Sequence, residues 1–135
     1  MKHSYTILGE PIPLLRNRIS YLKRVSYDSQ KEIKRYIAIE LAYQHGDRPI
    51  FKAPLKFTVT YYIPIAESWS KKKTLFYDGK PHHIRCDLDN LIKMSLDAAN
   101  KILYDDDAII AIIEAKKVFC TTNPRTEFTL EEISL

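Results

Sequence analysis

Hydrophobic and polar residues alternate most clearly between residues 55 and 65. The hydrophobic positions are Leu55, Phe57, Val59, Tyr61, Ile63 and Ile65. Because successive side chains of a strand point to opposite faces, this spacing predicts a β-strand with one face on the core. A weaker alternation from His3 to Leu8 predicts a first strand. The segment from Gly9 to Pro13 predicts a turn, because proline has no N–H to donate to a strand ladder.

Two segments repeat hydrophobic residues at helical spacing. The first spans residues 29–45, where Ser29 and Glu32 have the spacing of a capping box, and it should end near Gly46. Its hydrophobic positions are Ile33, Tyr36, Ile37 and Leu41. The second spans residues 88–102, with a stripe made of Leu88, Leu91, Ile92, Ser95, Ala99 and Ile102. Each segment is therefore expected to form an amphipathic helix with its stripe on the core.

The rest of the chain predicts two further strands and two irregular stretches. Ala108 to Ile113 is a continuous apolar run that favours a strand buried on both sides and continuing to Cys120, and residues 127–133 predict a last strand. Residues 16–28 and the long loop 66–86 show no regular pattern. We therefore expect one α/β (α+β) domain over residues 1–135, with a mixed sheet of about four strands and two main helices packed on it.

Composition limits the class of protein. A chain of 135 residues can bury roughly two thirds of its unfolded surface without a disulfide or a structural metal. It has no apolar run long enough to span a membrane, and its first residues do not resemble a signal peptide. The two cysteines, Cys86 and Cys120, lack CxxC spacing. We expect free thiols and a reducing, cytoplasmic location.

The net charge of +4 conceals two halves of opposite sign. Residues 1–86 hold 16 Lys and Arg against 7 Asp and Glu, whereas residues 87–135 hold 5 against 10. A basic surface favours a polyanionic partner such as a nucleic acid, although a lysine-rich solvated surface explains the first half equally well. The acidic second half favours the nucleic-acid reading, because a metal-bearing site that faces phosphates uses both signs of charge.

The acidic residues of the second half cluster at two places. Asp87 and Asp89 flank the start of the second helix, and Asp105, Asp106 and Asp107 precede the next strand. Carboxylates brought together by a fold repel one another, and a cation that accepts oxygen ligands, such as Mg²⁺ or Mn²⁺, offsets that repulsion. A helix followed by a returning strand can bring Asp107 beside the first pair. Lys93, one turn after Asp89, can then contact a scissile phosphate.

Each of these residues also has a purely structural explanation. Asp87 can cap the helix, and Asp89 can interact with the positive end of the helix dipole. The run of three aspartates can form a solvated turn, and Lys93 can pair with Asp89 and Asp97 on an exposed helix face. These explanations are sound one by one, but together they are less economical than a metal-dependent phosphodiesterase site.

At these residues the chain resembles the RusA-type Holliday junction resolvases (crossover junction endodeoxyribonucleases), which are common in phages and prophages. Asp87-Leu88-Asp89-Asn90-Leu91-Ile92-Lys93 matches the family's D-x-D-N-x-x-K helix start, and Asp106-Asp107 before Ala108 matches its Asp-Asp pair. A Gly-x-Pro-x-Pro turn followed by arginines, Gly9 to Arg18, resembles the family's opening. The resemblance covers nearly the whole chain in the order of its elements.

The resemblance implies a homodimer that cuts four-way DNA junctions with Mg²⁺ or Mn²⁺, and recombination or DNA repair as its context. Asp87, Asp89 and Asp107, or Asp106 in place of Asp107, would bind the metal, and Lys93 would assist catalysis. An isologous dimer suits a junction of roughly two-fold symmetry that needs two opposed cuts. Cys86 stands where many members have proline, which affects the approach of the preceding loop but not the chemistry.

Basic and aromatic residues supply candidates for the DNA surface. The basic candidates are Arg16, Arg18, Lys71, Lys72, Lys73 and Arg85. Trp69, Phe76 or Tyr77 can stack on an unpaired base or form a lid over the core. No Cys/His pair matches His82 and His83, so these histidines are expected to line the site rather than bind zinc.

Two other function classes remain open from the sequence. One is a non-catalytic DNA-binding or phage-assembly protein that keeps the acidic patch for stability or for calcium. The other is a metal-dependent phosphoesterase for small molecules, which the basic first half and the absence of a glycine-rich phosphate loop make weaker.

Overall fold

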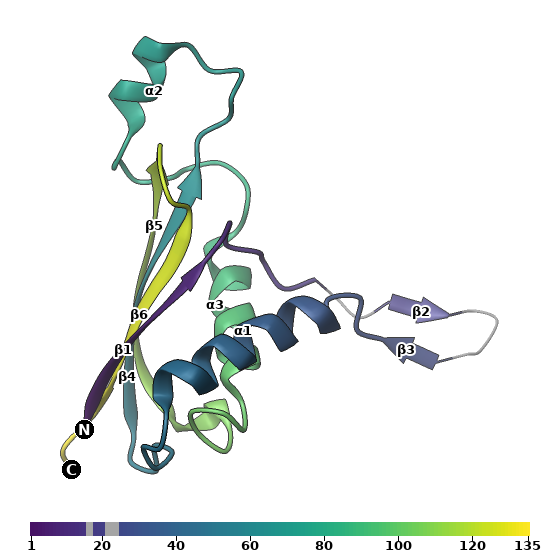
Figure 1. Ribbon diagram of the computed structural model, residues 1–135, viewed down its shortest axis with the longest axis vertical. Helices are drawn as coiled ribbons and strands as arrows, with labels where there is room; N and C mark the ends of the chain where they lie inside the picture. Colours follow the sequence, from purple (N-terminus) through teal and green to yellow (C-terminus); the bar gives the residue numbers. More distant parts are fainter. Residues whose placement is uncertain (16–17, 21–24) are drawn as a thin grey trace.

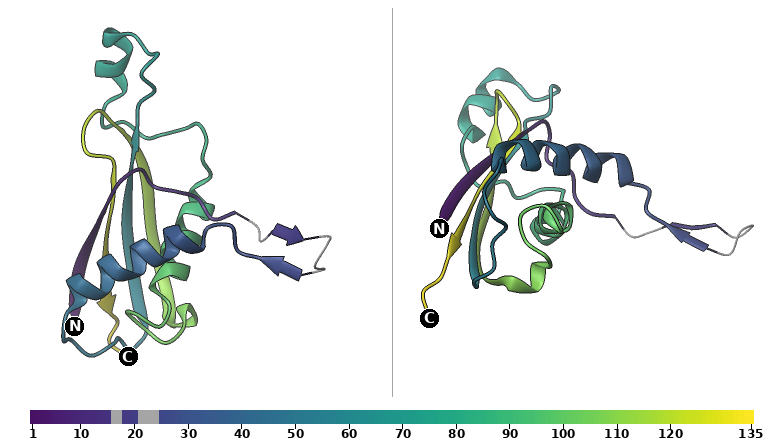
Figure 2. Two further views of the ribbon diagram at one scale, coloured as in Figure 1. Left: turned by 45° about the vertical axis from the view of Figure 1, so that its right-hand side comes forward. Right: turned by 60° about the horizontal axis from the view of Figure 1, so that its bottom comes forward.

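A four-stranded mixed sheet with helices on one face forms the protein. The computed structural model describes residues 1–15, 18–20 and 25–135. The sheet has the order β1-β6-β4-β5, formed by β1 (Lys2–Leu8), β6 (Arg125–Glu132), β4 (Leu55–Pro64) and β5 (Ile110–Cys120). Only β4 and β5 run parallel, and the other neighbours are antiparallel. Helices α1 (Lys31–His45) and α3 (Leu88–Ala99) lie on the same face of the sheet (Figures 1 and 2).

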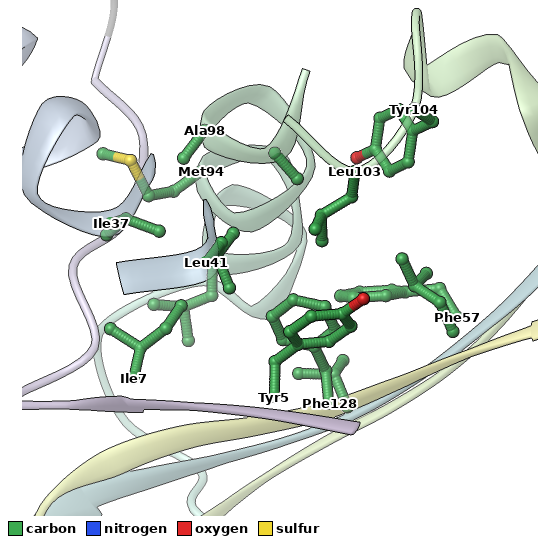
Figure 3. Close-up of a cluster of buried hydrophobic side chains, with 14 of the residues drawn as sticks. Tyr5, Ile7, Ile37, Leu41, Phe57, Met94, Ala98, Leu103, Tyr104 and Phe128 are labelled. Atoms are coloured by element: carbon green, nitrogen blue, oxygen red, sulfur yellow. The ribbon is translucent and has the colours of Figure 1, made fainter. Parts of the chain in front are cut away.

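The alternation over residues 55–65 predicted β4 and its buried face correctly. Leu55, Phe57, Val59, Tyr61 and Ile63 are all buried, and the residues between them are not. They share one core with Tyr5 of β1, Phe128 of β6, and Leu41 and Met94 of the helices (Figure 3). The core therefore lies between the sheet and the two helices, as expected for this α+β class.

The two predicted helices are present, but the capping box is wrong. Helix α1 begins at Lys31 after Gln30, with no side-chain cap bond. The buried Gln30 side chain instead accepts from the Leu15 N–H (2.8 Å) and donates to the Pro13 carbonyl (2.9 Å). The helix ends as predicted at Gly46, where φ is +64° and the N–H bonds the Ala42 carbonyl. Gln30 thus joins the start of α1 to the loop that follows β1.

Both stretches expected to be irregular contain regular structure. A seven-residue helix, α2 (Lys71–Tyr77), lies within the loop 66–86, and Ser70 caps it by accepting from the Lys73 N–H at 3.1 Å. The strands β2 (Arg18–Ser20) and β3 (Val25–Tyr27) pair as a small two-stranded ladder. That ladder projects away from the main sheet, whereas α2 stands beyond the sheet at the end where β4 finishes (Figure 1).

The apolar run from Ala108 to Ile113 is not buried on both sides, contrary to the prediction. Asp107–Ile109 forms a 3-10 turn (η1), and β5 begins only at Ile110. β5 is an edge strand, and the side chains of Ile112 and Ile113 are each 45% exposed. A long apolar edge is unusual, because unpaired strand edges invite association.

None of the helices that the structure describes is long and apolar enough to cross a membrane.

Candidate active site

The N-terminal end of α3 presents two carboxylates and an ammonium group to solvent. Asp87 is the N-cap residue, in an extended conformation, and its side chain makes no capping hydrogen bond. Asp89 lies in the first turn, and its carboxylate is 3.9 Å from the Lys93 Nζ. The Asp89 and Lys93 side chains are 70% and 62% exposed, so water weakens the ion pair between them and either group can leave it for another partner. These charges therefore remain free to meet a ligand.

The hydrophobic stripe of α3 fixes how this end is presented. Leu91, Met94, Ser95, Ala98 and Ala99 are buried, which directs Asp89 and Lys93 outward. The loop after β1 is bonded to the same end, because the Leu14 N–H donates to the Asn90 carbonyl at 2.9 Å. An open hollow beside it is lined by Leu14, Leu15, Asn90 and Lys93. The exposed side chains thus stand on a helix fixed by its core contacts.

The second acidic group lies beyond the other end of α3. The Asp106 side chain accepts from the Ala108 N–H at 3.1 Å and caps the turn η1. Asp107 makes no such cap bond, but it lies near Tyr104. Burial is the main cause that raises the pKa of the Tyr104 hydroxyl, and the negative charge of Asp107 raises it further. The Tyr104 hydroxyl itself donates to the Leu96 carbonyl, in the last turns of α3. Asp106 therefore has a structural role, and Asp107 is the freer carboxylate.

The structure does not bring the three predicted metal ligands together within one chain. Helix α3 has 12 residues, about 18 Å from end to end at 1.5 Å per residue. Asp87 and Asp89 belong to its first end, whereas Asp107 begins the turn η1 that follows its last end. Over residues 1–15, 18–20 and 25–135, no group of three Asp, Glu, His or Cys side chains is placed to hold one ion.

The basic candidates lie on three separate segments. Lys71, Lys72 and Lys73 are exposed on α2, and the Lys73 Nζ lies 3.9 Å from the centre of the Trp69 ring. Arg85 is exposed two residues before Asp87. Arg18 begins β2, but its side chain and the whole of Arg16 lie outside the described part of the chain.

The aromatic residues of the 66–86 segment divide into two groups. Trp69 and Tyr77 pack on Phe119, with ring centres 5.5 and 5.3 Å away, and so cover the end of the core. Phe76 is 59% exposed, and the Lys80 Nζ lies 4.0 Å from its ring centre. The buried His82 also packs on Phe119 at 4.5 Å. Of the three candidates for base stacking, only Phe76 is turned to solvent.

The chain matches a known protein family over nearly its whole length. The family model for Endodeoxyribonuclease RusA matches residues 9–131, nearly the whole chain. The chain belongs to the RusA endodeoxyribonuclease family. It is also 29% identical over 138 residues to the uncharacterized protein YqaN of Bacillus subtilis (strain 168), a match that covers 96% of each chain. RusA membership supports endodeoxyribonuclease activity of the Holliday-junction-resolving kind.

Sequence reasoning missed one cation beside this RusA motif. The Lys117 ammonium group, in β5, bonds the carbonyls of Ile84 and Cys86, directly before Asp87. No sequence signal identifies this lysine, because ten residues separate it from Asp107 and thirty from Asp87, and only the folded chain brings β5 beside the segment that enters α3.

Proposed function

We propose that this chain is a homodimeric, Mg²⁺- or Mn²⁺-dependent resolvase that hydrolyses phosphodiester bonds in four-way DNA junctions in the cytoplasm. Asp87, Asp89 and Asp107 are the proposed metal ligands, and Lys93 is the proposed catalytic cation. The observation that carries this proposal is the N-terminal end of α3. There Asp87 makes no capping hydrogen bond, and the exposed Asp89 lies one helical turn before the exposed Lys93, within the motif that resembles the family's.

The donor set fits a hard divalent cation. Carboxylate oxygens are the ligands that Mg²⁺ accepts, and it keeps several waters, so two or three protein carboxylates suffice. Asp87 makes no cap bond, and Asp89 has only a solvated lysine 3.9 Å away. A metal bound there would supply Lewis acidity at the phosphoryl oxygen and a more acidic water. Lys93 would contact the scissile phosphate and stabilise the charge that develops on it.

The free edge of β5 supports the homodimer. On the side away from β4, residues 79–82 pair with the far end of β5, through bonds of Gly79 and Lys80 to Phe119 and of His82 to Lys117. On that same side, away from β4, no described segment pairs with the stretch from Ile110 to Lys116. The middle of that stretch is Ile113, next to the equally exposed Ile112. Antiparallel pairing of two such edges about a two-fold axis would cover both side chains.

That pairing also explains the separation of the carboxylates. β5 starts just after Asp107 and passes Lys117, whose ammonium group bonds the carbonyl next to Asp87. A two-fold axis near Ile113 exchanges these two ends of the strand. Asp107 of the partner subunit would then approach Asp87 and Asp89, so that each of the two sites takes ligands from both chains.

Branched DNA is the proposed partner, and the basic segments are its proposed contacts. Phosphate contacts by Lys71, Lys72 and Lys73, by Arg85, and by Arg16 and Arg18 would orient the junction arms without reading sequence. A non-catalytic DNA-binding or phage-associated role is the second candidate, and the uncommitted Asp87 and Asp89 favour catalysis over it.

Cleavage of a mobile four-way junction, compared with a linear duplex of the same sequence, tests the proposal. We expect paired symmetric nicks in the junction alone, in Mg²⁺ or Mn²⁺, abolished by EDTA and by Asp107→Asn. Asp89→Asn should abolish cutting yet keep junction binding, because it removes negative charge near the phosphates. Tight binding of the wild-type protein without any cut would favour the non-catalytic role, and neither binding nor cutting would exclude both.

A further inference from the structure

Lys117 lies on the side of β5 that faces the helices. Its partner in the β4–β5 register is Tyr61, which is buried in the core, so both side chains point to the covered face of the sheet. The half-buried Lys117 side chain reaches the segment that enters α3. There its ammonium group donates to the Ile84 carbonyl at 2.6 Å and to the Cys86 carbonyl. One lysine thus bonds the carbonyls of the residues before and after Arg85. The residue that follows Cys86 is Asp87, the N-cap of α3.

The charge of Lys117 has no acidic partner among the described residues. No carboxylate in that part of the chain lies within 4.0 Å of its Nζ, although the same strand carries Glu114. The nearby His82 also carries no charge that would repel the Lys117 ammonium group at pH 7. Burial, and then the positive charges of Lys117 and His83, lower the pKa of His82 to about 4, so its ring is neutral at pH 7. The two carbonyls are therefore the groups that this ammonium binds.

The main chain alone leaves the end of this segment unattached. The Gly79–His82 stretch is bonded to β5 through Phe119 and Lys117. Between His82 and the start of α3, residues 83–87 make no backbone hydrogen bond to the sheet. Asp87 makes no side-chain cap bond that would fix it from the helix side. The Lys117 ammonium group supplies the missing attachment at the two residues closest to the carboxylate.

We propose that Lys117 is a positioning residue of the nuclease site, which holds the 84–86 backbone so that the Asp87 carboxylate is preorganised for the metal. This inference rests on the proposed function for its catalytic consequence, though not for its structural one. Groups that orient metal ligands typically contribute 10–100-fold to metal affinity or activity. Lys117 would act through the backbone, without touching the substrate.

Lys117→Met tests the proposal, because methionine keeps the length of the side chain and removes the charge and the donors. We expect faster amide hydrogen exchange at His82 and Leu91, whose N–H groups bond the Lys117 and Asp87 carbonyls on either side of the segment, and an Mg²⁺ concentration for half-maximal junction cleavage raised about 10-fold or more. Junction affinity in Ca²⁺ should not change. Lys117→Arg should restore part of both effects. Lys116→Met, an exposed lysine on the opposite face of the strand, is the matched control and should behave as wild type.

The two readouts separate the failure of this proposal from the failure of the proposed function. If wild-type protein cuts no junction, the exchange measurement still decides whether Lys117 holds the segment. Wild-type exchange at His82 and Leu91 in Lys117→Met would overturn the proposal. Faster exchange combined with an unchanged Mg²⁺ requirement would overturn it too, because the attachment would then have no bearing on Asp87. An equal loss in Lys117→Arg and Lys117→Met, with a lowered melting temperature in both, would indicate packing alone.

Discussion

Asp87 and Asp107 stand beyond opposite ends of α3, a helix of 12 residues, although the sequence motif associates them in one site. The helix is a rigid spacer, so no side-chain rotation within one chain joins the two carboxylates. The free edge of β5 runs between the same two ends. The proposed second copy of the chain, paired along that edge, would reconcile the motif with the geometry.

Breaking the proposed edge-to-edge contact should produce a monomer. Ile113→Lys places a charge at the middle of the free stretch, where two copies of the lysine would meet and repel. We expect the mass from sedimentation to fall from twice 15.8 kDa to 15.8 kDa, with loss of junction cleavage. Ile39→Lys, on an equally apolar and 58% exposed position of α1, is the control and should leave a dimer. A dimer in Ile113→Lys would show that the contact lies elsewhere.

The exposed lysines of α2 should contribute to DNA affinity through phosphates. Replacing Lys71 and Lys72 by glutamine is expected to weaken junction binding and to reduce the slope of log K against log salt by about 2. Fluorescence anisotropy over a range of salt concentrations measures both quantities. The control is Lys31→Gln with Lys52→Gln, two exposed lysines at other places, which remove the same charge. An equal change of slope in both double variants would argue against a contact specific to α2.

The buried His82 should make stability depend on pH. Burial, followed by the charges of Lys117 and His83, lowers its pKa from 6.5 to about 4. Between these values the unfolded chain takes up a proton that the folded chain does not, so this contribution is full above pH 6.5 and declines as pH falls towards 4. One proton corresponds to at most about 1.4 kcal/mol per pH unit. Urea unfolding at pH 7 and pH 5 should therefore show a smaller difference for His82→Phe than for wild type. Equal differences would refute this origin.

The sequence predicted the elements whose pattern depends on one face of the core. β4, α1 and α3 follow from alternation and helical spacing, and the residues at the start of α3 follow from the motif. Ser29 failed as a cap because Gln30 bonds the loop at Pro13 and Leu15, a tertiary contact that no local pattern encodes. Helix α2 had one local signal, the Ser70 cap, but its seven residues are too few for a helical period.

The misreading of β5 has a different physical cause. A continuous apolar run indicates burial on both sides, yet Ile112 and Ile113 are exposed in the single chain. Periodicity records which residues require burial, not whether the same chain or another copy covers them. The prediction that Asp107 lies beside Asp87 and Asp89 is not met within the single chain, and a sequence motif does not say whether its residues meet within one chain or between two.

Mixing two inactive variants tests the central claim most directly. Asp89→Asn and Asp107→Asn are each expected to cut no junction. If each site takes Asp87 and Asp89 from one chain and Asp107 from the other, a mixed dimer holds one intact site. Unfolding and refolding the two variants together should then restore Mg²⁺-dependent nicking to about a quarter of the wild-type level, since half the dimers are mixed and one of their two sites is complete. Refolding each variant alone is the control. No nicking by the mixture, with wild-type protein active after the same treatment, would contradict the shared site.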